Sequence, residues 1–115
     1  AESAYRSTIT TDDAAAAVIS ALDAPSGLFN VVEDRPSTRS EQVAALAHAL
    51  EVAVPSPPAV TPPLPAPFAV LLRSQRVSNQ RFSDATGWRP AFPSPQEGWA
   101  HVVADWRAHR DELGA

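Results

Sequence analysis

Two arginines, Arg73 and Arg76, are the residues most suited to bind a charged substrate. They lie just before a predicted turn into a short helix, where two guanidinium groups can hold a diphosphate through paired hydrogen bonds. The alternative is that both are solvated, or that one of them packs on the ring of Trp88. The sequence therefore makes Arg73 and Arg76 the candidate substrate-binding residues.

A second set of polar residues, Glu97, His101, Asp105 and His109, recurs every four positions along one predicted helix. Such side chains can ligate a metal, but His101 falls about 200° around the helix from Trp99, on the face away from the core. Solvated i, i+4 charge pairs explain the stripe, so we predict no metal site. A hydrolytic triad is not expected either, because no serine lies on a Gly-x-Ser-x-Gly turn.

The composition narrows the chemistry further. The 115 residues carry a formal net charge of −4 at pH 7, which argues against nucleic acid and anionic membranes as partners. There is no cysteine for disulfides or thiolate chemistry, which fits a cytoplasmic location. No apolar run approaches the ~20 residues of a membrane helix. The four glycines are far apart, so the glycine-rich loop that binds a dinucleotide is missing. We therefore predict that this chain alone binds no cofactor.

The elements that must position these residues follow from the hydrophobic pattern of one domain, residues 1–115. Residues 3–10 and 28–32 are predicted strands, the second apolar on both faces, as in a sheet covered on both sides. Three helices each present an apolar face to the core. The first, capped by Thr11 or Asp12, would bury Ala15, Val18, Ile19 and Leu22; the second would bury Val43, Leu46, Ala47 and Leu50; and the third, residues 95–113, would bury Trp99, Val102, Val103 and Trp106.

Local signals fix the helix ends. Capping boxes at residues 38–41 and 94–97 should start the second and third long helices. Asn79 can cap a short helix that stops at Gly87, followed by an elbow around Trp88.

The segment 54–67 is unusual because it contains seven prolines and cannot be a helix or a central strand. We expect it to cross the surface as a stiff, polyproline-like connection. A ligand for a proline-recognition domain is the less favoured alternative. Residues 68–72 should then form a short apolar helix.

Three stretches in order resemble the C-terminal region of extended short-chain dehydrogenase/reductase proteins, the NAD-dependent epimerase/dehydratase family. They are TITTDDAAAAVISAL, SGLFNVVEDRPSTRSEQVAALAHAL and RVSNQRFSDATGWRPAFPSPQEGW. The last is similar to that family's short helix, Gly-Trp-x-Pro elbow and following helix. The resemblance covers essentially the whole chain and implies a substrate-binding region beside a cofactor held elsewhere.

The resemblance also implies what this chain lacks. The family's catalytic pair is a tyrosine with a lysine four residues later, which lowers the phenol pKa. This chain has no lysine and only one tyrosine, Tyr5, so we expect no catalytic residue in it. NAD or NADP would belong to a parent enzyme. The resemblance supports Arg73 and Arg76, because sugar-nucleotide enzymes of this kind often place an arginine near here to hold the nucleotide diphosphate.

The sequence therefore predicts a mixed, helix-rich α/β fold with four or five helices and two or three short strands. The resemblance implies that this fold is the C-terminal part of a Rossmann-like epimerase/dehydratase without its dinucleotide-binding half. That half, in the same chain or a separate subunit, is the expected partner. Without it, the apolar segment 28–32 should drive the chain into a homodimer or larger oligomer. The alternative function is a stand-alone interaction or oligomerisation module, such as one subunit of a split enzyme.

Overall fold

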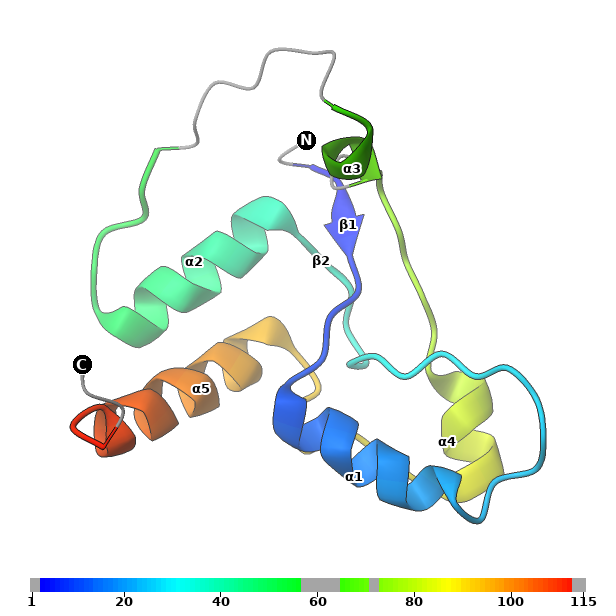
Figure 1. Cartoon of the computed structure of the whole chain (residues 1–115). Helices are drawn as coiled ribbons and strands as arrows, with labels where there is room; N and C mark the ends of the chain where they lie inside the picture. Colours follow the sequence, from blue (N-terminus) through cyan, green and yellow to red (C-terminus); the bar gives the residue numbers. More distant parts are fainter. Residues whose placement is uncertain (1–2, 57–64, 71–72, 113–115) are drawn as a thin grey trace.

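The computed structural model of the chain describes residues 3–56, 65–70 and 73–112 (Figure 1). Within them it contains five helices and a two-stranded sheet, so the expected helix-rich α/β class is confirmed. The elements in chain order are β1 (Tyr5–Arg6), α1 (Thr11–Ala21), β2 (Ser37–Thr38), α2 (Arg39–Leu50), α3 (Ala66–Ala69), α4 (Gln80–Thr86) and α5 (Pro95–His109). β1 and β2 are antiparallel, with Tyr5 opposite Thr38. Helices α2 and α5 lie side by side, and α1 lies near α4 (Figure 1).

Of the two capping boxes predicted from the sequence, only one forms in the structure. The predicted capping box of α2 is confirmed: the Thr38 hydroxyl accepts a hydrogen bond from the Glu41 amide at 3.2 Å, and the Glu41 carboxylate accepts one from the Thr38 amide at 2.8 Å. The second box is wrong. Ser94 stands at the N-cap of α5 and Pro95 follows, but the Ser94 side chain makes no cap hydrogen bond.

The short helix α4 ends as predicted but starts differently. Gly87 adopts a left-handed conformation, with φ of 77°, and closes the helix. Asn79 is at the N-cap, but its side chain does not cap the helix. Its amide instead donates to the Val32 carbonyl at 2.8 Å and to an Asp34 carboxylate oxygen at 2.7 Å. Asn79 therefore ties α4 to a loop that is distant in sequence.

The largest side chains of the core come from the elbow and α4. Phe82 packs edge-on against Trp88 and against Phe29, with ring centroids 5.6 Å apart in both pairs. Ala17 of α1 completes the buried cluster. The predicted aromatic elbow is thus the point where α1 and α4 meet.

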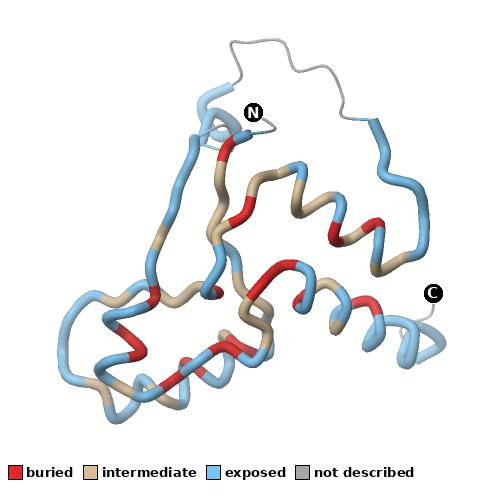
Figure 2. Tube along the Cα trace, turned by 180° about the vertical axis from the view of Figure 1, so that it is seen from behind, coloured by how far each residue is buried: buried red, intermediate tan, exposed pale blue. Residues whose placement is uncertain are grey.

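The predicted buried face of α1 is wrong. Val18, Ile19 and Leu22 are 67%, 69% and 80% exposed, while Asp13 and Ala17 are the buried residues of this helix. Figure 2 shows that most of the helix is exposed, with only isolated buried positions. The apolar spacing identifies a face that needs cover, but no described element provides it.

The predicted strand at residues 28–32 is also wrong, since the structure assigns no strand to these residues. Phe29 and Val31 pack against the core, whereas Leu28 is 89% exposed. Short strands need a neighbouring strand to satisfy their backbone groups, and none lies beside this segment in the described chain.

Helix α5 packs on α2. Val103 is buried, and the Trp99 indole donates to the Gln42 side-chain oxygen at 3.0 Å. Val102 and Trp106 remain 39% and 43% exposed, against expectation, and the helix stops at His109. A Cβ on Gly98 would lie 3.1 Å from the Thr10 methyl group, so this glycine permits close approach to the start of α1.

The proline-rich crossing is only partly visible. Residues 57–64 and 71–72 lie outside the described residues, and residues 54–56 are exposed. The expected short helix appears as α3, two residues earlier than predicted, with Pro65 at its N-cap. No helix in the described part of the chain is long and apolar enough to cross a membrane.

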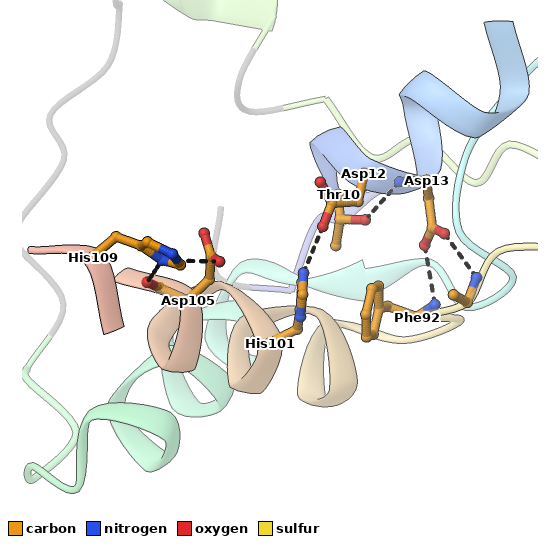
Figure 3. Close-up of polar contacts among 8 residues, drawn as sticks. Thr10, Asp12, Asp13, Phe92, His101, Asp105 and His109 are labelled. Atoms are coloured by element: carbon orange, nitrogen blue, oxygen red, sulfur yellow. Dashed lines mark hydrogen bonds and ion pairs between the residues drawn. The ribbon is translucent and has the colours of Figure 1, made fainter. Parts of the chain in front are cut away.

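Asp13 connects α1 to the loop before α5 (Figure 3). One carboxylate oxygen accepts from the Ala91 amide at 2.8 Å and the other from the Phe92 amide at 3.0 Å. Its own amide donates to the hydroxyl of Thr10, which is the N-cap in place of the expected Thr11 or Asp12. Asp13 is 4% exposed, so these bonds are made out of contact with water.

We expect Asp13→Asn to lower the free energy of unfolding by about 1–3 kcal/mol, because an amide cannot accept from both backbone N–H groups. Urea denaturation would measure the change. Asp23→Asn, at the exposed end of α1, is the matched control and should cost under about 0.5 kcal/mol. Equal effects of the two substitutions would contradict the anchoring role of Asp13.

Candidate functional site

The segment that carries the predicted arginines runs along β1. The Gln75 amide donates to the Tyr5 carbonyl at 2.8 Å, and the Tyr5 amide donates to the Ser74 hydroxyl at 3.0 Å. The Val77 amide then donates to the Ser7 hydroxyl at 2.9 Å. These bonds hold the chain before α4 in a fixed register on the first strand.

This register places Arg76 on the ring of Tyr5, with the guanidinium carbon 3.7 Å from the ring centroid. Stacking of this kind leaves the edge of the guanidinium free to form hydrogen bonds to an anion. The aromatic partner is therefore Tyr5 and not Trp88, whose ring is buried against Phe82.

Arg76 borders two open hollows, which we call the Arg76 hollows. The first, of about 290 Å³, is lined by Tyr5, Arg35, Pro36, Glu41 and Arg76. The second, of about 330 Å³, is lined by Asp34, Pro36, Arg76, Val77, Ser78, Asn79, Gln80 and Arg89. Arg73 is exposed but lines neither hollow, so the structure does not bring Arg73 and Arg76 together there.

The hollows add two arginines that the sequence analysis did not select. Arg35 lines the first and Arg89 the second, and we call Arg35, Arg76 and Arg89 the arginine cluster. Arg35 and Arg89 each precede a proline, which keeps the backbone extended at that point. Two Arg-Pro pairs at turns were the signal that could have identified them.

Two acids, Asp34 and Glu41, bring negative charge to this surface, but among the described residues neither forms an ion pair with the arginine cluster. Asp34 accepts its hydrogen bond from the Asn79 amide, and Glu41 accepts its own from the Thr38 backbone, so both acids are held by neutral donors. In the part of the chain that the structure describes, the Arg35 and Arg89 side chains form no hydrogen bond or ion pair. The arginine cluster can therefore offer guanidinium donors to a phosphate or carboxylate.

The two histidines of the α5 stripe each contact a different carboxylate. His101 lies 2.6 Å from an Asp12 carboxylate oxygen and stacks on Phe92, and His109 pairs with Asp105 one turn earlier (Figure 3). Across the described residues, no three His, Cys, Asp or Glu side chains are grouped so as to hold a metal ion. His101 and Asp12 instead join α5 to α1.

One buried carboxyl, Glu33, was not selected from the sequence. It is 3% exposed, and its Oε1 accepts a hydrogen bond from the Thr8 hydroxyl at 2.6 Å. Burial raises the pKa of Glu33 above its ordinary value of 4.5; the Thr8 hydrogen bond opposes this shift, and the negative charge of Asp13 adds to it.

No protein-family model matches this sequence, and no curated protein shows significant similarity to it. Its fold, however, matches parts of solved structures. A functionally unknown conserved protein from Silicibacter pomeroyi DSS superposes with a TM-score of 0.74 at 24% identity, over 89% of this chain and 38% of that one. RMD from Pseudomonas aeruginosa, solved in complex with NADPH, superposes with a TM-score of 0.71 at 20% identity, over 94% of this chain and 34% of that one.

The chain has the fold of one part of RMD. It spans little more than a third of either matched structure, so most of each matched protein has no counterpart here.

The raised pKa of Glu33 predicts a pH dependence of folding. The folded chain binds the Glu33 proton more tightly than the unfolded chain, so stability should fall as the pH rises from about 4.5 through the folded pKa. Glu33→Gln should remove this decline and gain stability relative to the parent as pH rises. Urea unfolding between acidic and neutral pH would test it, with the exposed Glu97→Gln as control. A parallel pH profile for Glu33→Gln and the parent would contradict the assignment.

Proposed function

We propose that this chain is the substrate-side part of an NAD(P)-dependent oxidoreductase of the epimerase/dehydratase kind, and that its substrate is a nucleotide sugar. The observation that carries the proposal is the fold match, over nearly the whole chain, to RMD in its complex with NADPH. The order of the sequence motifs supports the same assignment. In this proposal the nicotinamide cofactor is bound by another part of the enzyme, and this chain alone is not catalytic.

The arginine cluster would bind the diphosphate of the substrate. Arg76, held on Tyr5 and bordering both hollows, is the central residue, and Arg35 and Arg89 flank it. Guanidinium groups in this setting recognise two neighbouring phosphates better than one, because each can form a bidentate contact. Arg73 keeps its predicted role only if it reaches a ligand that extends beyond the hollows.

The partner we propose is the dinucleotide-binding half, covering the apolar face of α1. Val18, Ile19, Leu22 and Leu28 are all more than half exposed, and this set is here called the α1 apolar face. Contiguous apolar surface of this kind marks a contact with another protein part. The same face supports the alternative function, an interaction module or one subunit of a split enzyme, since both need a second chain.

The diphosphate hypothesis can be tested on this chain by NMR titration with uridine diphosphate. We expect saturable shifts of the Arg76 side-chain N–H, and none with uridine, which lacks phosphate. Arg76→Ala should weaken binding by about 1–3 kcal/mol, the value of a charge-assisted hydrogen bond. Arg73→Ala in the same assay would measure how much Arg73 contributes to binding of uridine diphosphate.

Arg110→Ala is the matched control, because Arg110 is exposed at the end of α5 and lines neither hollow. If it weakens binding as much as Arg76→Ala, the interaction is only a general attraction to positive charge. Absence of any shift at millimolar uridine diphosphate would also refute the proposal.

Self-association of the isolated chain is a separate prediction. The sequence placed the interface at residues 28–32, but in the structure Leu28 is the exposed apolar residue of that segment, and Val18, Ile19 and Leu22 of α1 are exposed as well. We expect light scattering at tens of micromolar to show a dimer or larger species. Ile19→Glu with Leu22→Glu should give a monomer that still folds, because both side chains are solvent-exposed. A monomeric parent chain would contradict the prediction.

A further inference from the structure

A second cavity lies away from the Arg76 hollows, where the chain after β1 meets α2 and α5. It has a volume of about 230 Å³, and its walls include Ile9, Pro95, Trp99 and Val102. A water molecule occupies about 30 Å³ of the liquid, so this space can hold a small organic molecule. Because Glu33 also lines it, we call it the Glu33 cavity.

The polar side of the Glu33 cavity is a directed chain of hydrogen bonds. The Trp99 indole donates to the Gln42 oxygen at 3.0 Å, and the Gln42 amide nitrogen donates to the Thr8 hydroxyl at 3.1 Å. The Thr8 hydroxyl donates to Glu33 Oε1 at 2.6 Å. An indole can only donate, so it fixes the orientation of the Gln42 amide and leaves the Thr8 proton for Glu33.

The chain of donors satisfies only one oxygen of Glu33. Within the described residues Oε2 has no hydrogen-bond partner, and it keeps access to the open space beside it, because it is not one of the buried side-chain atoms left unpaired. No arginine or histidine is among the residues that line the cavity. A carboxylate oxygen that opens into a mostly apolar space can accept a hydrogen bond from a ligand, and a cationic donor pairs with it most strongly.

We propose that the Glu33 cavity binds a small apolar molecule with a primary ammonium group. The ammonium would donate to Glu33 Oε2, and the apolar body would lie against Trp99 and Val102. The negative charge of Asp13 interacts with Glu33 and favours a cation over a neutral donor at this position. This site is independent of the arginine cluster, which selects for the opposite charge.

The test uses the 15N-labelled chain and the indole N–H signal of Trp99, assigned by its loss in Trp99→Phe. Benzylamine is the probe, and benzyl alcohol is its neutral counterpart of similar shape. At neutral pH we expect a saturable shift with benzylamine and about tenfold weaker binding of benzyl alcohol. Glu33→Gln should abolish this preference, while Glu97→Gln, an exposed carboxylate on the same helix as Trp99, should retain it.

A second variant keeps the proposal testable if the Glu33→Gln chain does not fold. Val102 is 39% exposed at the edge of the cavity, so Val102→Phe can fill the space from its open side and should block benzylamine while the rest of the spectrum is preserved. The proposal is overturned if benzyl alcohol binds as tightly as benzylamine, or if Val102→Phe still binds benzylamine. It is also overturned if the Trp99 indole signal does not shift at millimolar benzylamine.

Discussion

The arrangement of the chain depends on the carboxylate of Asp13. It is buried at the start of α1, yet it accepts hydrogen bonds from two consecutive amides that lie 78 and 79 residues further along the chain. An ionised acceptor that satisfies two backbone donors out of water is among the stronger polar contacts available to a protein. The Asp13 carboxylate therefore fixes the loop between Trp88 and α5, and with it the direction in which α5 extends from that loop. The Asp12–His101 pair and the Phe92–His101 stack then hold α5 against α1.

Two local signals were predicted correctly from the sequence, although a third, the Ser94–Glu97 box, does not form. The Thr38–Glu41 box and the left-handed Gly87 depend only on residues within one turn, so their patterns were sufficient. Sequence reasoning failed where the same side chain has a stronger distant partner. Asn79 could cap α4, but its amide bonds the loop at Val32 and Asp34 instead. No rule of spacing predicts such a choice.

The wrong predictions for α1 and for residues 28–32 both concern apolar surface that needs cover. Helical periodicity placed the cover of α1 within this chain, whereas residues 28–32 were expected to need cover from the missing half. The described residues do not supply it: Leu22 and Leu28 are 80% and 89% exposed. The candidate site was partly predictable for a similar reason. Arg76 was found from its place before a turn, whereas Arg35 and Arg89 join it only through the folding of distant loops.

The small core explains why a covering partner matters energetically. The buried hydrophobic core among the described residues consists of four alanines with Val103, Phe82 and Trp88. Alanine contributes little apolar area. The side-chain hydrogen bonds of Asp13 and Asn79 therefore carry an unusual share of the specificity of this fold. Burying a side chain such as Ile19 or Leu22 contributes about 1.5–3 kcal/mol, whereas a whole domain is stable by only about 5–15 kcal/mol. Covering the α1 apolar face would therefore change the stability of this chain by a large fraction. Binding of the partner and folding of the chain are, on this argument, thermodynamically coupled.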